Sequence, residues 1–397
     1  MAQSVTQRLV AAIDTDWIEE QAWRMLEIPS VTMDEAEVCA LFEGQMRDLG
    51  LDVDVRPVDD EGRNNLYARI AGQGTGPTLH LNGHLDTIPL GDAWPPERRA
   101  DRLYGRGATD MKGGMASMLG AAKAIIDSGT RLRGDLVLSA VGGHEETIAR
   151  KDGPLALIAD INSGRIAADR ILIVEGRDAL WVMSMGSMVF TIHLDSDRGG
   201  MHTQYVPFSQ NPLRHVGDLL AAIQSHQEHL DATTDHPLAG AERIDVGSVH
   251  GGDYFNRTPT RCTLMGTRRW CPGRNAQQVL EEIEALAKPF ALAGNLHLTV
   301  EMEHEREPFE TPREDAAVCA VSHAHEMVTG DQADLVGLRI VGDANLYVHG
   351  CSVPTFYYGP SNETAHADTE WVDIKRLHDA AAVYALTAAD YCGLAAE

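Results

Sequence analysis

Cysteine is scarce in this sequence and never occurs in closely spaced pairs. The chain has 6 cysteines, scattered between Cys39 and Cys392 without a C-x-x-C motif. This distribution argues against a zinc site built from thiolates and is typical of free thiols in a reducing compartment. We therefore expect a cytoplasmic protein.

Basic charge and long apolar runs are also lacking. Lys and Arg number 33 against 59 Asp and Glu, which gives a formal net charge of −26. Nucleic acids and anionic membranes bind basic surfaces, so neither is an expected partner. No apolar run reaches membrane-spanning length, and the first residues lack the basic-then-apolar pattern of a secretory signal. We expect most of the acidic charge to serve solubility and a smaller part to hold cations.

Length and hydrophobic patterning indicate two domains. A chain of 397 residues exceeds one ordinary hydrophobic core. In its first part, apolar strands alternate with amphipathic helices, which predicts an α/β fold with a mostly parallel sheet. The expected helices span 16–28, 35–49 and 111–128, and the expected strands span 78–86, 134–141 and 170–176.

The middle of the chain has a different pattern. Strands and helices follow one another as β-α-β-β-α-β between residues 187 and 303. This is the order of a ferredoxin-like α+β unit, which could fold by itself. Buried-strand character returns at residues 353–361. We therefore predict one discontinuous α/β domain, formed by residues 1–186 and 304–397, with residues 187–303 inserted as a second domain.

Two side chains with metal-ligand chemistry share one face of the expected strand 78–86. In "TLHLNGHLD" the leucines occupy one parity, and His84 and Asp86 occupy the other. Because successive side chains of a strand point to opposite faces, His84 and Asp86 are predicted to lie on the same side. The spacing suits an imidazole ligand oriented by a nearby carboxylate.

Four more stretches rich in acids or histidine lie at predicted strand ends. They are "GRGATDMKGG" (105–114), "GGHEET" (142–147), "VEGRD" (174–178) and "NETAHADTEW" (362–371). Each alone has a plain structural explanation, such as an N-cap for Asp110. Together they bring imidazole and carboxylate groups to one edge of a sheet, where α/β proteins bind ligands. Such ligands without cysteine suit zinc, manganese or cobalt, and one central aspartate indicates two ions that share a bridge.

The ordered set of motifs resembles the zinc aminoacylase and carboxypeptidase family, which includes acetylornithine deacetylase, succinyl-diaminopimelate desuccinylase and glutamate carboxypeptidase. "GHLDTIP" matches its GHxDxxP, "DMKGG" its D-M-K-G, and "AHADTEW" its late A-H-x-x-x-E. "HEE" matches its acidic pair, although His144 stands where the family usually has aspartate. The resemblance covers nearly the whole chain and implies a di-metal hydrolase domain with an inserted lid and dimerisation domain.

The resemblance also implies a set of ligands. His84, Asp110 and Glu175 would hold one divalent ion, and Asp110, Glu146 and His366 the other. Zinc is the family's metal, and cobalt or manganese would fit the same ligands.

Three catalytic residues are carried over in the same way. Glu145 would be the general base, and Asp86 would orient the His84 ring. His202, in "GGMH", would stabilise the oxyanion in the active site of a neighbouring subunit, which implies a homodimer formed through the inserted domain. The alternative for His202 is a histidine in a hairpin loop.

Substrate contacts are expected from the inserted domain and its exit. Asn256 lies in "GGDYFNRTP" and Arg269 begins "RWCP", where an arginine could grip a carboxylate. Neighbouring Arg268 could fill that role instead, or both could be surface charges. Asn345 stands where relatives often have an arginine, and "VEGRD" lacks the proline that usually follows the glutamate.

These features together predict a di-metal hydrolase that cleaves an amide bond of a small molecule. The leading hypothesis is deacylation of an N-acetyl or N-succinyl amino acid by a metal-bound hydroxide. The alternatives are an exopeptidase on small peptides and, more distantly, a hydrolytic deaminase or ureido-hydrolase. A non-catalytic binding protein is disfavoured because Glu145 and all five ligand positions are present. A purely structural metal site is disfavoured because such sites are usually closed and rich in cysteine.

Overall fold

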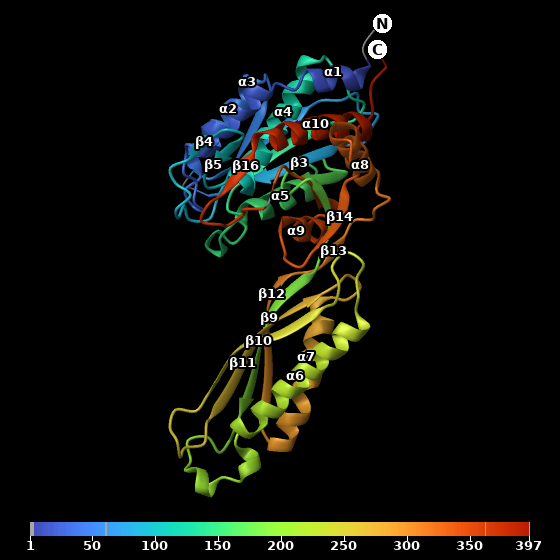
Figure 1. Ribbon diagram of the computed structural model, residues 1–397. Helices are drawn as coiled ribbons and strands as arrows, with labels where there is room; N and C mark the ends of the chain where they lie inside the picture. The colour runs from blue at the N-terminus through green and yellow to red at the C-terminus, as the bar shows by residue number, and fades with distance from the viewer. Residues whose placement is uncertain (1–3, 60–61, 362, 397) are drawn as a thin grey trace. The chain divides into compact units, whose positions relative to one another are not determined.

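The computed structural model describes residues 4–59, 62–361 and 363–396, which form two compact units (Figure 1). The first unit contains residues 1–182, 311–336 and 346–397, and the second contains residues 183–310 and 337–345. The domain boundaries expected from the sequence, after residues 186 and 303, stay a prediction.

The first unit is built on a mixed β-sheet. Its strand order is β1-β2-β6-β3-β7-β15-β8, and β14 also pairs with β8. The last two residues of β8 already belong to the second unit, where they pair with β13. The central strands β6, β3, β7 and β15 run parallel, whereas β1, β2 and β8 pair antiparallel with their neighbours. The strands are β1 Val53–Pro57, β2 Asn64–Ile70, β3 Leu79–His84, β6 Leu136–Val141, β7 Arg170–Ile173, β8 Ala179–Ser184, β13 Phe309–Glu310, β14 Asp334–Leu338 and β15 Thr355–Tyr357. The expected α/β fold class is confirmed.

Helices cover this sheet on both sides. Figure 1 shows α4 and α10 on one side and α5 on the other. The helices are α1 Val5–Ala11, α2 Thr15–Leu26, α3 Ala36–Asp48, α4 Gly113–Asp127, α5 Asp152–Asn162, α8 Ala316–Thr329, α9 Asp343–Gly350 and α10 Ile374–Tyr391. Nearly all of α4 is buried, because its sequence is apolar or small at almost every position. None of the described helices is both long and apolar enough to span a membrane.

A glycine in the first turn of α4 allows that helix to begin very close to the residue that follows β7. A side chain at Gly114 would put its Cβ only 1.8 Å from the carbonyl oxygen of Val174. Only glycine tolerates such an approach. The "KGG" sequence therefore brings the turn that carries Asp110 next to the strand end that is followed by Glu175.

A small antiparallel sheet joins two segments that are far apart in the sequence. It is formed by β4 (Glu97–Arg99), β5 (Arg102–Tyr104) and β16 (Trp371–Asp373), with β5 in the centre. β5 precedes the turn that contains Asp110, and β16 follows the loop that contains His366. The pairing of β5 with β16 therefore holds these two turns close together.

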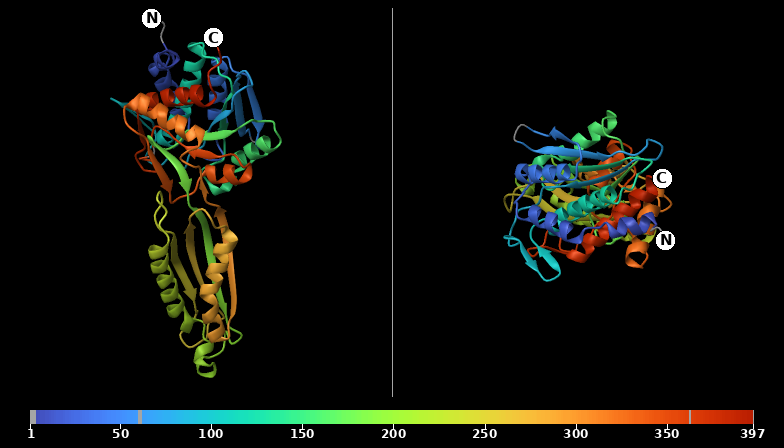
Figure 2. Two further views of the ribbon diagram at one scale, coloured as in Figure 1. Left: turned by 90° about the vertical axis from the view of Figure 1, so that its right-hand side faces the viewer. Right: turned by 90° about the horizontal axis from the view of Figure 1, so that it is seen from above.

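The second unit is a four-stranded antiparallel sheet with two helices. Its elements are β9 Gly186–Asp195, α6 Leu213–Thr233, β10 Arg243–Gly251, β11 Arg261–Trp270, α7 Ala276–Gly294 and β12 His297–Arg306. The strand order is β10-β11-β9-β12. Figure 2 shows α6 and α7 side by side along this sheet, and their apolar faces form its core with β9 and β11. The predicted β-α-β-β-α-β order is confirmed.

Candidate metal centre

The candidate site begins at the ends of neighbouring parallel strands. His84 is the last residue of β3 and pairs with Val141, the last residue of β6. On the other side of β3, Asn82 pairs with Ile173 at the end of β7. Because parallel strands end at the same edge, the loops after β3, β6 and β7 leave the sheet together, as the sequence predicted.

Four of the predicted site residues meet at this edge. Nε2 of His84 lies 3.2 Å from Oδ1 of Asp110, and Oδ2 of Asp110 lies 3.3 Å from Nε2 of His366. Oε2 of Glu145 lies 3.3 Å from the same His366 nitrogen. Among the described residues, His84, Asp110 and Glu145 form the group whose ligand atoms all lie within 4.8 Å of one another. Asp110 therefore lies between two imidazoles, as a bridging ligand would.

Two buried atoms in this cluster are suited to a cation. In the described part of the chain, Nε2 of His84 and Oδ1 of Asp110 have no hydrogen-bond partner. His84 is only 2% exposed and Asp110 only 8%. Leaving a buried polar atom without a partner costs about 1–3 kcal/mol. A divalent ion bound to both atoms would remove that cost, so the donor set fits the metal that the sequence implies.

The tautomer of His84 agrees with this role. Nδ1 of His84 lies 2.9 Å from the main-chain oxygen of Asp86. A carbonyl oxygen can only accept, so Nδ1 carries the hydrogen and the neutral ring has its lone pair on Nε2. That lone pair points toward Asp110, in the direction a metal ligand requires.

The electrostatic field at the cluster favours positive charge. Burial alone would lower the pKa of His84, but the Asp110, Asp86 and Glu145 carboxylates outweigh it and raise that pKa well above its ordinary value. The hydrogen bonds of His366 to Asp110 and Glu145 raise the pKa of His366 to about 10. The same carboxylates would stabilise a metal cation in place of these protons.

Asp86 contacts the site differently from the prediction. Its carboxylate accepts the backbone N–H groups of His144 at 3.0 Å and of Glu145 at 2.8 Å, and also the Thr32 hydroxyl at 2.8 Å. The His84 ring is bonded to the Asp86 main chain, and the nearest carboxylate oxygen lies 3.7 Å away. Asp86 thus contacts the ring through its main-chain oxygen and the loop that carries Glu145 through its carboxylate.

Two predicted ligands lie nearby in sequence without joining the trio. Glu146 directly follows Glu145, and its backbone N–H donates to Thr32 Oγ1 at 3.3 Å. Glu175 is half-buried, two residues beyond the end of β7. The group of described residues within mutual ligand distance includes neither of them. Their assignment as ligands stays a prediction.

The predicted residues of the second unit belong to two separate places within it. The side chains of Asn256 and His202 lie 3.1 Å apart, Nδ2 to Nε2, on neighbouring loops. Asn345 is 2% exposed, and its amide donates to the Glu307 carbonyl at 2.7 Å and accepts from the Gly342 N–H at 3.1 Å. Both the oxygen and the nitrogen of the Asn345 amide are therefore hydrogen-bonded within the protein. These bonds do not support the predicted contact of Asn345 with substrate, which stays a prediction.

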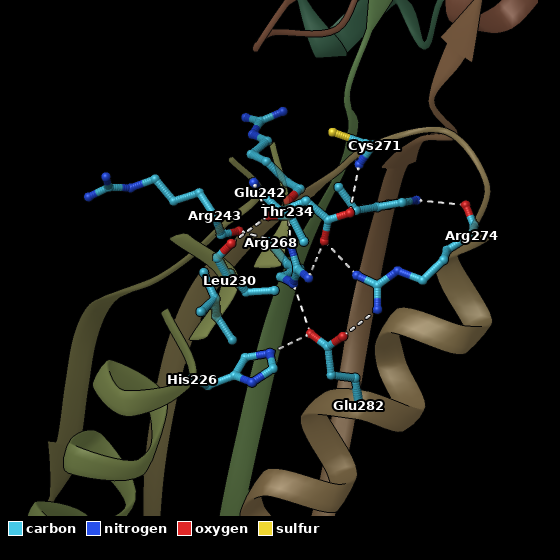
Figure 3. A network of polar contacts seen from close by, with 12 residues as sticks. His226, Leu230, Thr234, Glu242, Arg243, Arg268, Cys271, Arg274 and Glu282 are labelled. Carbon is cyan, nitrogen blue, oxygen red and sulfur yellow. Dashed lines mark hydrogen bonds and ion pairs between the residues drawn. The ribbon is translucent and has the colours of Figure 1, made fainter. Parts of the chain in front are cut away.

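Arg268 and Arg269 differ sharply in their surroundings. Arg268 is fully buried, and its guanidinium pairs with Glu242 at 2.6 Å and Glu282 at 3.0 Å (Figure 3). Arg274 contacts the same two carboxylates, and His226 reaches Glu282 at 2.9 Å. Arg268 is thus part of the internal frame of the unit. Arg269 is partly exposed and remains the predicted substrate contact of the two.

This network gives a prediction about stability in acid. Burial alone would raise the pKa of Glu282, but the hydrogen bond from His226 and the charges of Arg268 and Arg274 hold that pKa below its ordinary value of 4.5. A lowered folded-state pKa contributes stability above pH 4.5, which is lost as the pH falls further. Replacing Glu282 by glutamine should cost about 3 kcal/mol of unfolding free energy at pH 7, the low end for breaking a buried pair, because Glu242 still pairs with Arg268.

Denaturant unfolding at pH 7 and at pH 3 measures this effect. The Glu282→Gln variant should lose less stability than the parent protein between the two pH values. Glu281→Gln, at an exposed neighbour on α7, is the control and should change stability by less than about 0.5 kcal/mol. Equal effects of the two substitutions would contradict the buried network.

Two residues next to the cluster were not predicted from the sequence. Glu370 and Arg106 are buried beside the Asp110 turn and pair with each other at 2.8 Å. Glu370 closes the "AHADTEW" motif and Arg106 belongs to "GRGATD", so both were inside quoted motifs without a role. Only the pairing of β5 with β16 brings them together.

Comparisons with known proteins agree with this geometry. The model of Peptidase family M20/M25/M40 matches residues 80–390. A succinyl-diaminopimelate desuccinylase from Dinoroseobacter shibae is 27% identical over 384 residues, covering 92% of this chain and 97% of that protein. Among solved structures, aminopeptidase PepT from Bacillus cereus has a TM-score of 0.75 at 18% identity, covering 96% of this chain and 99% of that one. A dinuclear metal-binding peptidase from Bacillus subtilis has a TM-score of 0.72 at 15% identity, covering 94% and 97%. These two structures share the fold of this chain.

Proposed function

Because the chain belongs to the peptidase family M20/M25/M40, whose members are metal-dependent hydrolases of C–N bonds, we propose that it deacylates an N-acyl amino acid. The observation that carries the proposal is the cluster of His84, Asp110, Glu145 and His366, in which two buried polar atoms of His84 and Asp110 lack a hydrogen-bond partner among the described residues. The reaction adds water across an amide bond and releases a carboxylic acid and an amine.

The ligand set of the proposal is the one expected from the sequence. Asp110 would hold both ions, His84 and Glu175 would complete one site, and Glu146 and His366 would complete the other. Zinc is the proposed metal, and cobalt or manganese suits the same oxygen and nitrogen ligands. Bound divalent ions supply Lewis acidity, which lowers the pKa of water toward about 7 and polarises a carbonyl group.

Glu145 is the proposed general base. It takes one proton from the attacking water and delivers it to the nitrogen of the leaving amine, so that no net proton is gained or lost. Its carboxylate lies 3.3 Å from His366 Nε2, beside the residues that would hold the ions. The two N–H bonds from the Glu145 loop to Asp86 support the role, because they fix the main chain from which the carboxylate projects.

The proposed substrate class follows from the relatives. Desuccinylases match this chain over 92% of its length, which favours a succinylated or acetylated amino acid. A screen of the zinc-loaded protein against N-succinyl and N-acetyl amino acids, including N-succinyl-diaminopimelate, tests this choice, with dipeptides and tripeptides as the comparison. Faster release of succinate or acetate is expected. Faster release of free amino acids from peptides would replace the deacylase by an exopeptidase.

We further propose that the protein is a homodimer joined through the second unit, with His202 completing the active site of the partner chain. His202→Ala and Glu145→Gln should each be nearly inactive alone. After unfolding, mixing and refolding, they should recover about a quarter of the parent activity, since half the dimers are mixed and each mixed dimer keeps one complete site. Each variant refolded alone is the control. No recovery from a mixture shown to contain mixed dimers would contradict action across subunits.

A further inference from the structure

We propose that Glu370, paired with Arg106, is a positioning residue that holds the main chain of Asp110 in the orientation needed to bridge two metal ions. The inference rests on the proposed function, because it concerns the ions of the same site. It assigns a role to the last residue of the "AHADTEW" motif, which the ligand set leaves unused.

Glu370 contacts the Asp110 turn through one carboxylate oxygen and the Arg106 guanidinium through the other. Oε1 accepts the backbone N–H of Thr109 at 2.9 Å and that of Asp110 at 3.1 Å. Oε2 accepts from Nη1 of Arg106 at 2.8 Å. Two consecutive peptide groups of the bridging turn are thus bound to one side chain, which restricts the direction in which the Asp110 side chain leaves the main chain.

The Arg106 guanidinium extends this hold to a third segment. Its Nε donates to the carbonyl of Pro89, in the loop that follows the His84 motif, at 3.2 Å. Glu370 is 1% exposed and Arg106 is 5% exposed. A buried charge is tolerated only when it is paired and hydrogen-bonded, so the two residues depend on each other.

The same carboxylate also belongs to the segment that carries His366. Glu370 follows His366 by four residues. The main-chain carbonyl of Glu370 accepts the N–H of Gly105 at 3.0 Å. The hydroxyl of Thr109 donates to the carbonyl of Trp371 at 3.1 Å. These bonds set the position of the Asp110 turn against the His366 loop, and the Asp110 and His366 side chains lie 3.3 Å apart across that junction.

A second buried carboxylate in the site makes the same contact. Asp86 accepts the consecutive N–H groups of His144 and Glu145, at 3.0 and 2.8 Å. The turn with the bridging aspartate and the turn with the proposed base are therefore each held by one acid that accepts two neighbouring peptide groups. Glu370 does for Asp110 what Asp86 does for Glu145.

The test measures metal affinity and ligand geometry without substrate. Glu370→Gln keeps the size of the side chain and one acceptor oxygen but removes the charge opposite Arg106. Residues that orient metal ligands typically contribute 10–100-fold in affinity, so the dissociation constant of Zn²⁺, measured by competition with a chelating dye, should rise by about that factor. The visible spectrum of the Co²⁺-loaded protein, which reports ligand geometry, should also change.

Asp315→Asn is the matched control. The side chain of Asp315 is 6% exposed. It accepts from Nε of Arg170 at 2.6 Å and from the N–H of Ala317 at 2.9 Å, so it combines an arginine and a backbone N–H as Glu370 does. Arg170 lies at the beginning of β7, the end opposite the site. The control should lose stability without changing Zn²⁺ affinity or the Co²⁺ spectrum.

The double variant Arg106→Met with Glu370→Gln separates positioning from stability. It removes the unpaired buried cation, so stability should recover while Zn²⁺ affinity stays low. It also keeps the test decisive if Glu370→Gln fails to fold. Recovery of affinity together with stability, or an equal loss of affinity in Asp315→Asn, would overturn the proposal. If the parent protein binds metal but hydrolyses no acylated amino acid, only the proposed function fails.

Discussion

Replacing Asp110 by asparagine should remove most of the bound metal and lower turnover by about a thousandfold or more, which corresponds to the several kcal/mol that metal ions contribute to such transition states. The two oxygens of Asp110 face different imidazoles, His84 at 3.2 Å and His366 at 3.3 Å. A neutral amide offers one oxygen and no charge, so it cannot bind both ions. Metal content per chain and hydrolysis rate of the same preparation measure the effect.

Asp160→Asn is the control for this substitution. Asp160 lies on α5 and is 9% exposed, against 8% for Asp110. Its carboxylate pairs with the Arg165 guanidinium at 2.7 Å. Its replacement should leave metal content and turnover unchanged. An Asp110→Asn protein that keeps two ions per chain and turns over within tenfold of the parent would show that Asp110 is no bridge.

Glu145→Gln should lose about 10²–10⁴-fold in turnover, the usual contribution of a general base, and should keep its metal. Glu146→Gln should lose metal instead. The two variants differ only in which of two adjacent carboxylates is neutral. The Glu145 carboxylate lies 3.3 Å from His366, so its position alone fits either a base or a ligand. Comparing the metal content of the two variants shows which of the two carboxylates is the ligand.

Metal analysis of both purified variants, alongside their turnover, decides the assignment. Loss of an ion from Glu145→Gln and full metal content in Glu146→Gln would make Glu145 the ligand and leave the base to another residue. Glu281→Gln, an exposed acid on α7, serves as the control for a neutralised carboxylate and should behave like the parent protein.

The sequence was sufficient to find the edge of the sheet where the cluster lies. The parity of His84 and Asp86 on an apolar strand, and the position of Asp110 before a helix, are local features. Parallel strands then bring their ends together without any further information. The local patterns of apolar residues along the strands and helices between residues 187 and 303 likewise predicted the order of elements in the second unit.

What the sequence could not supply depends on contacts between distant segments. The backbone of the Glu145–Glu146 loop is bonded to Asp86 and Thr32. These bonds determine which of the two glutamates points toward Asp110. Arg268 and Arg269 alternate along β11, and only the packing of α7 shows that Arg268 is the buried one. Glu370 and Arg106 meet only after β16 pairs with β5.

Anomalous diffraction from a crystal of the zinc-loaded protein tests most directly whether Asp110 lies between two metal ions. Two anomalous peaks are expected on either side of the Asp110 carboxylate, one beside His84 and the other beside His366. A map without a peak within bonding distance of Asp110, from a protein shown to be folded and exposed to excess zinc, would contradict this position.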